Sequence, residues 1–168
     1  MATMRSEVYL ELYRRVYGSE RVKKTLITLD AVCVALAALS YVFALIFMGV
    51  SELSLMTPLR LIISTGVPFL AVSIMRCVMN LPRPCKVLEM DFLPNKKEGV
   101  SFPSRHVFSA FSIGTALCFV MLPLGIFVLV LGVICAACRV CLGNHFIRDV
   151  VAGATIGVVC SVLGMLIL

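Results

Sequence analysis

Long apolar stretches dominate the pattern of hydrophobic and polar positions along this chain. Five of them are separated by short polar connections or by Pro and Gly, at residues 25–50, 58–80, 103–122, 124–141 and 144–168. A helix of about 20 such residues crosses a hydrocarbon core about 30 Å thick. No strand-like alternation is seen, and a backbone in lipid must satisfy its own hydrogen bonds. The pattern therefore predicts an all-α integral-membrane bundle of about five spanning helices.

A different pattern precedes the first span. Tyr9, Tyr13 and Tyr17 recur every four residues on one face, and charged residues occupy the other faces. Aromatic residues are enriched at membrane–water interfaces, so this stripe predicts an amphipathic helix at the headgroup level. An ordinary soluble helix is the alternative. We accordingly divide the chain into an interfacial segment, residues 1–24, and a membrane-embedded domain, residues 25–168.

Composition supports the membrane interpretation. The hydrophobic fraction is 61% and the charged fraction 14%, against roughly 45–50% and about 25% in soluble domains. The net charge of +6 does not indicate nucleic-acid binding, because no basic stretch is interleaved with aromatic residues. Cys135, Cys138 and Cys141 form a C-x-x-C-x-x-C run. Without His or acidic residues in the preceding turns, they are better explained as small residues at a helix contact than as metal ligands.

The positive charges are concentrated on one side of the predicted bundle. When the spans alternate in direction, 14 of the 15 Lys and Arg residues fall on the same side as the N-terminus, and only Arg60 falls on the other. Cytoplasmic segments of membrane proteins carry an excess of Lys and Arg. We therefore expect this side to be cytoplasmic, in a protein of the plasma membrane.

Three polar clusters lie at span ends on that same side, and ionisable residues at membrane depth are functional candidates. The clusters are Arg76 with Arg83-Pro84, Pro103-Ser104-Arg105-His106, and Arg139 with His145 and Asp149. Each cluster alone has an ordinary structural explanation, such as a helical ion pair or a polar helix end. Together they suggest a single site.

The third cluster has the spacing of an activated nucleophile. His145 and Asp149 are four residues apart, hence on one face of a helix and within reach of each other. A carboxylate that accepts from one ring nitrogen fixes the tautomer and leaves the other nitrogen free to attack.

The other clusters suit a phosphoryl group. His106 lies at a helix N-terminus, where free amides and the helix dipole favour an anion. Arg76, Arg83 and Arg139 supply planar forks that match phosphate oxygens. Two histidines and several arginines, without a carboxylate-rich metal cage, indicate phosphoryl transfer by positioning and electrostatics.

These motifs resemble those of the type 2 phosphatidic acid phosphatases, which share a helical core with vanadium haloperoxidases and bacterial acid phosphatases. The family signature is K-x6-R-P, P-S-G-H and S-R-x5-H-x3-D, and order and spacing match here. Three positions depart from it, with Arg76 for Lys, Arg105 for Gly and Cys138 for Ser. The predicted span count is also one fewer than the six usual in membrane members, which bears on sidedness.

The resemblance implies a mechanism. His145 attacks phosphorus to form a phosphohistidine, Asp149 orients it, and His106 acts first as acid and then as base. The phosphate-binding residues it implies are Arg76, Arg83, Ser104, Arg105 and Arg139. It implies no cofactor and no metal, and a lipid phosphate as substrate, such as phosphatidate, phosphatidylglycerophosphate or a polyprenyl diphosphate.

Two other functions remain open from the sequence. One is a catalytically silent membrane protein that binds anionic lipid headgroups through the same arginines. The other is an oxidising vanadate enzyme on the same helical core, which the short, lipid-buried chain makes the weaker alternative.

The last span also shows a ridge of small residues. Gly153, Gly157 and Ser161 continue the four-residue spacing of His145 and Asp149. Such G-x-x-x-G steps let a neighbouring helix approach closely. We expect this packing to hold the catalytic pair in place, although general packing unrelated to catalysis is the alternative.

Overall fold

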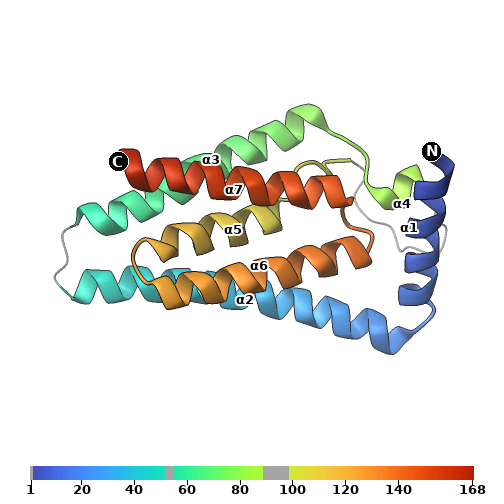
Figure 1. The fold of residues 1–168 in the computed structure, drawn as a ribbon, viewed down its shortest axis with the longest axis horizontal. Helices are drawn as coiled ribbons and strands as arrows, with labels where there is room; N and C mark the ends of the chain where they lie inside the picture. Colours follow the sequence, from blue (N-terminus) through green and yellow to red (C-terminus); the bar gives the residue numbers. More distant parts are fainter. Residues whose placement is uncertain (1, 52–54, 89–98) are drawn as a thin grey trace.

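The computed structural model describes residues 2–51, 55–88 and 99–168 (Figure 1). The charged residues between positions 89 and 98, which contribute to the predicted charge bias, lie outside this set. The described residues form seven helices: α1 (Ala2–Tyr17), α2 (Glu20–Val50), α3 (Met56–Met79), α4 (Pro84–Val87), α5 (Arg105–Cys118), α6 (Leu122–Cys141) and α7 (Ile147–Ile167).

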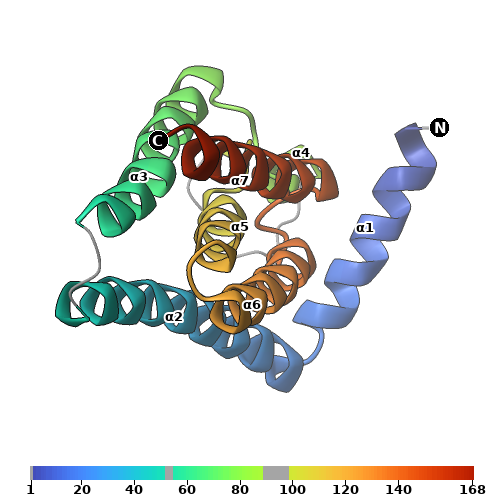
Figure 2. The ribbon, with the colours of Figure 1, turned by 60° about the vertical axis from the view of Figure 1, so that its left-hand side comes forward.

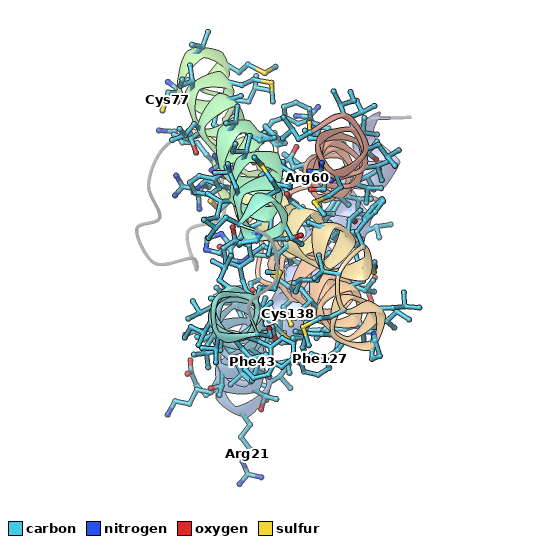
Figure 3. The ribbon with its side chains drawn as sticks, turned by 90° about the vertical axis from the view of Figure 1, so that its left-hand side faces the viewer. Arg21, Phe43, Arg60, Cys77, Phe127 and Cys138 are labelled. Carbon is cyan, nitrogen blue, oxygen red and sulfur yellow. The ribbon has the colours of Figure 1, made fainter. Side chains whose placement is uncertain are left out.

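Four stretches are long and apolar enough to cross a membrane, namely α2, α3 with its continuation to Val87, α6 and α7. The all-helical membrane bundle expected from the sequence is therefore confirmed. Figure 3 looks along the bundle. Outward-facing side chains such as Phe43 and Phe127, which are 53% and 44% exposed, suit contact with lipid tails.

The helix of the third predicted span is shorter than the apolar run of residues 103–122. α5 has 14 residues, because Ser104 is its N-cap and a turn at residues 119–121 separates it from α6, which has Pro123 in its first turn. α5 packs against α2, α3, α6 and α7 and lies at the centre of the bundle (Figure 2). Because other helices cover α5, its length need not match the thickness of the bilayer.

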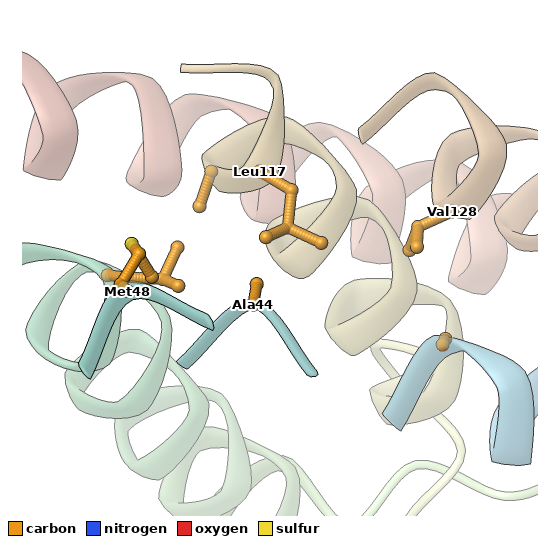
Figure 4. Packing of buried hydrophobic residues seen from close by; sticks show 7 residues of the cluster. Ala44, Met48, Leu117 and Val128 are labelled. Carbon is orange, nitrogen blue, oxygen red and sulfur yellow. The ribbon is translucent and has the colours of Figure 1, made fainter. Parts of the chain in front are cut away.

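A hydrophobic cluster joins α2, α5 and α6 at the end of the bundle opposite α1. Ala44 and Met48 of α2 contact the region of Leu117 in α5 and Val128 in α6, and all four are fully buried (Figure 4). Their burial anchors the C-terminal end of α5 against α2 and α6.

The small-residue ridge of α7 packs directly against α5, as the sequence predicts. A Cβ atom at Gly153 would lie 2.6 Å from the carbonyl oxygen of Ser104, and one at Gly157 would lie 2.7 Å from that of Phe108. One turn further along, Ser161 shares a 2.7 Å hydrogen bond with Ser112. Side chains larger than hydrogen would separate these two helices. Whether the contact governs catalysis stays a prediction.

The tyrosine stripe of α1 faces the protein rather than lipid headgroups. Tyr13 is 0% exposed. The hydroxyl of Tyr17 donates to the carbonyl of Leu142 at 3.1 Å, and the hydroxyl of Tyr9 accepts from the amide of Ile147 at 3.3 Å. Tyr13 is therefore closed off from headgroups, because periodicity alone does not tell a lipid-facing stripe from a protein-facing one. Tyr9 and Tyr17 are half-buried, and the place of α1 at the headgroup level stays a prediction. α1 instead crosses the end of the bundle and contacts the α6–α7 connection.

The chain connections that carry the three predicted motifs lie at this same end. Figure 1 shows which helix ends lie near α1: the starts of α2, α5 and α7 and the ends of α3 and α6. The C-terminus lies at the opposite end. Arg21 extends away from the helices at the α1 end, and Arg60 lies near the start of α3 at the other end. The three motifs are thus gathered at one end of the bundle.

The α5–α7 contact predicts the effect of adding a methyl group. Gly157→Ala places a Cβ against the Phe108 carbonyl, and overpacking of this kind costs typically about 1–3 kcal/mol. Gly66→Ala in α3 is the matched control, because a Cβ there meets nothing within 4 Å and Ala is favoured over Gly in helices by about 1 kcal/mol. Thermal unfolding in detergent should show Gly157→Ala less stable and Gly66→Ala unchanged or more stable than the original protein. Equal stability of the two variants would contradict the close-packing account.

Candidate active site

The candidate site is assembled from three connections at the α1 end of the bundle. The segment between α3 and α5 supplies Ser101 and Ser104, the first turn of α5 supplies His106, and the α6–α7 connection supplies His145. Asp149 follows in the first turn of α7. Residues that are far apart in the sequence thus meet where two central helices begin.

Asp149 is the buried acceptor at the centre of this assembly. Its side chain is 0% exposed and accepts hydrogen bonds from the Ser101 hydroxyl at 2.6 Å and the Phe146 amide at 3.1 Å, both through Oδ2. Arg148 lies 3.4 Å from the other carboxylate oxygen. Buried carboxylates are stable only when paired or hydrogen-bonded. The Asp149 carboxylate therefore has a fixed position.

His145 lies beside this carboxylate. Its Nδ1 is 3.8 Å from Oδ2 of Asp149, which is within ion-pair range but longer than a hydrogen bond. Nδ1 is one of three buried side-chain nitrogen or oxygen atoms that lack a hydrogen-bond partner in the described part of the chain. The other ring nitrogen, Nε2, is not one of these three buried atoms without a partner. Catalytic hydrogen bonds are often long in structures without substrate and tighten when it binds, so Nδ1 is the nitrogen that Asp149 can hold.

Burial lowers the pKa of His145 below its ordinary value. The positive charges of Arg76 and Arg83 lower it further, whereas interaction with Asp149 opposes the shift. The imidazole is therefore neutral near pH 7, which is the form that can act as a nucleophile.

Ser104 links the start of α5 to the start of α7. Its amide donates to the Asp149 carbonyl at 2.9 Å, and its hydroxyl is buried without a partner among the described residues. As the N-cap of α5, Ser104 precedes amides that have no partner within the helix. A buried hydroxyl beside free amides at a helix N-terminus is suited to an anion.

Arg76 lies beside the segment that leads into α5. Its guanidinium donates to the backbone carbonyls of Val100 and Pro103, and lies 3.4 Å from that of Ser101. Both terminal nitrogens are therefore used to hold the segment that leads into α5. Arg76 therefore shapes the candidate phosphate site through these carbonyls, and its direct contact with phosphate stays a prediction.

The other predicted cations surround the same region. Arg83 donates from Nε to the Gly99 carbonyl at 3.3 Å. Arg105 is exposed and lies 5.7 Å from the centre of the Phe69 ring. Arg139 is paired through Nε with Asp30 of α2 at 2.9 Å. His106 lies two residues after Ser104, whose amide donates to the Asp149 carbonyl, so the first turn of α5 brings His106 close to the start of α7.

Sequence reasoning missed two partners of these residues. Ser101 precedes the second motif by two residues, and its hydroxyl gave no signal in the sequence beyond its place near Pro103. Asp30 was visible as the one charged residue within the apolar run 25–50, but no spacing linked it to Arg139, which is 109 positions away.

A cavity of about 300 Å³ opens beside the site. Arg105 and His106 lie at its polar end, and the rest of its lining comes mostly from apolar side chains of α2, α3, α5 and α6. A second cavity of about 280 Å³ shares Phe69, Ser109 and Ile113 with the first. The two cavities therefore lie side by side along α5, as a largely apolar groove.

No group of three His, Cys, Asp or Glu side chains that could hold a metal ion is found in the part of the chain that the structure describes. Cys135 and Cys138 of the C-x-x-C-x-x-C run are buried, as expected of small residues at a helix contact.

Comparison with known proteins identifies similar folds. The chain is similar to LpxE from Aquifex aeolicus, with 28% identity, a TM-score of 0.67 and coverage of 92% of this chain and 93% of that one. It is also similar to the first transmembrane PAP2-type phosphatidylglycerolphosphate phosphatase from Bacillus subtilis, with 20% identity, a TM-score of 0.60 and coverage of 94% and 90%. No curated protein matches the sequence significantly.

The model of the PAP2 superfamily matches residues 57–168. This range begins at the second residue of α3 and contains all three motifs, with His106, His145 and Asp149 among them. The chain belongs to the PAP2 superfamily of phosphatases.

Proposed function

We propose that this protein hydrolyses a lipid phosphate through a phosphohistidine on His145. The observation that supports the proposal most strongly is the buried carboxylate of Asp149, held by Ser101 and the Phe146 amide beside Nδ1 of a neutral His145. A histidine oriented in this way presents Nε2 as the nucleophile. A silent protein that only binds headgroups would have no need of this arrangement.

The reaction proceeds in two displacements. Nε2 of His145 attacks phosphorus, the bond from phosphorus to the leaving oxygen breaks, and His106, which enters the step protonated, donates its proton to that oxygen. A water molecule then gives its proton to His106 and attacks the phosphohistidine, and the phosphorus–nitrogen bond breaks to release phosphate. One histidine thus serves as acid and then as base.

The surrounding cations hold the transferred group. Arg83, Arg105 and Arg139, with the hydroxyl of Ser104 and the first amides of α5, bind the equatorial oxygens, over which charge is spread in the transition state. Arg76 contributes by holding the 100–103 segment in place. Loss of one such donor typically costs on the order of 10²–10³ in rate.

The apolar groove along α5 supports a lipid as the substrate. Its polar end is formed by His106 and Arg105, and its walls are formed mainly by apolar side chains of membrane helices. A headgroup phosphate at the polar end leaves the attached chain directed along the groove. The phosphate contacts do not select among phosphatidate, phosphatidylglycerophosphate and polyprenyl diphosphates.

The charge bias supports a cytoplasmic active site. The helix ends that carry the site lie at the end of the bundle where α1 and its basic residues lie. Cytoplasmic segments carry an excess of Lys and Arg, and a plasma-membrane location follows the same proposal.

The first prediction concerns the nucleophile. Purified protein should release phosphate from a vesicle-borne lipid phosphate in the presence of EDTA, because the proposed chemistry uses side chains alone. His145→Ala should release none above background, and Ser40→Ala, which alters a buried polar residue of α2 away from the site, should retain activity. Full activity in folded His145→Ala would refute the assignment.

The second prediction concerns the protonation of His145. Because its pKa lies below the ordinary value of 6.5, the neutral imidazole persists at lower pH than in an unfolded chain. The rate at which diethyl pyrocarbonate acylates the His145 peptide can be followed by mass spectrometry. Plotted against pH, this rate should therefore have its midpoint below pH 6.5. The same shift makes folding less favourable as pH falls below about 6.5, since the unfolded state binds the proton more readily. A midpoint above pH 6.5 would show that the Asp149 interaction outweighs burial.

The third prediction concerns sidedness. In a background that lacks the eight native cysteines, a membrane-impermeant maleimide added to intact cells should label Arg60→Cys and leave Arg21→Cys unlabelled. Permeabilised cells serve as the control, in which both should react. Labelling of Arg21→Cys alone in intact cells would place the active site outside.

A further inference from the structure

Asp30 is a buried carboxylate on α2 that the proposed reaction does not yet use. It is 8% exposed within a 31-residue apolar helix. Its Oδ1 accepts from Nε of Arg139 at 2.9 Å and from Sγ of Cys135 at 3.4 Å. Removing a charge from water costs several kcal/mol per ion even after relaxation, and ionisable residues within membrane helices face protein partners and mark functional sites.

The geometry of this pair leaves part of the guanidinium available. Asp30 takes the Nε–H edge of Arg139, and no second ion pair of this guanidinium is found in residues 2–51, 55–88 and 99–168. A guanidinium has a second edge, formed by its two terminal nitrogens, that matches two phosphate oxygens. An Arg fixed through Nε can therefore present this second edge in a constant direction.

The pair lies close to the candidate site. Cys135, which donates to Oδ1 of Asp30, lines the cavity that His106, the proposed acid, also lines. Cys33, one turn after Asp30 on α2, lines the same cavity as His106 and Cys135. The Asp30–Arg139 pair thus lies next to residues that line this cavity.

We propose that Asp30 is a positioning residue that orients Arg139 end-on toward the transferred phosphoryl group. This inference rests on the proposed phosphatase function. Asp30 lies outside the residues 57–168 that match the family, so it makes the N-terminal helix α2 part of the active site. The alternative is an ion pair that only fastens α2 to α6.

A phosphate-binding measurement separates orientation from simple charge. Asp30→Asn removes a negative charge near the site. The loss of Coulomb repulsion alone would therefore tighten the binding of inorganic phosphate. If Asp30 orients Arg139, its loss instead weakens binding. We expect the inhibition constant of inorganic phosphate to rise several-fold in Asp30→Asn. A lower constant, or an unchanged one, would overturn the proposal.

Turnover gives a second, independent readout. Asp30→Asn should lower kcat by on the order of 10–10² per folded molecule, since it weakens one transition-state donor. Asp30→Glu should recover part of the loss. In Arg139→Ala, the further change Asp30→Asn should have almost no effect, because the two residues act as one unit.

Controls keep the outcomes distinct. Ser40→Ala on the buried side of α2 should match the original protein, and thermal unfolding measures the folded fraction of each variant. If the original protein releases no phosphate, the proposed function fails. If it is active and Asp30→Asn equals it in kcat, or if the two substitutions act additively, the positioning role alone is refuted.

Discussion

The structure depends on the burial of one carboxylate where two central helices begin. Asp149 is fully enclosed, so its oxygens must be satisfied by protein groups. These come from two segments: Ser101 before α5, and the Phe146 amide with Arg148 at the start of α7. The Asp149 carbonyl also accepts a hydrogen bond from the amide of Ser104. Each partner fixes a segment that the proposed reaction needs. His145 is held next to the carboxylate because the same turn carries both residues.

This arrangement requires that α5 and α7 lie very close together. Gly153 contacts the Ser104 carbonyl with no space for a side chain, and Gly157 repeats the contact one turn later. In lipid, where apolar burial gives little driving force between helices, close packing of small residues and interhelical hydrogen bonds supply the stabilisation. The polar site is therefore supported by the packing beneath it.

Much of this could be predicted from the sequence, and the failures have physical reasons. Apolar run lengths predicted the helices, because run length reflects local helical geometry. The spacing between His145 and Asp149 predicted the pair, although His145 lies just before the N-cap of α7 and not within the helix. The length of α5 was overestimated, since an apolar run does not show that neighbouring helices cover it. The direction of the Tyr13 face and the backbone contacts of Arg76 depend on tertiary contacts that periodicity does not encode. The pairing of Asp30 with Arg139 joins positions 109 apart and left no local signal.

The central claim is that His145 itself becomes phosphorylated, and rapid-quench labelling tests it directly. A lipid phosphate carrying radioactive phosphorus would be mixed with the His106→Ala variant, in which the second displacement lacks its base, so that the intermediate accumulates. We expect an acid-labile, alkali-stable phosphoryl group on the peptide that contains His145. Product formation without any label on the protein, or a label on a different residue, would contradict the account.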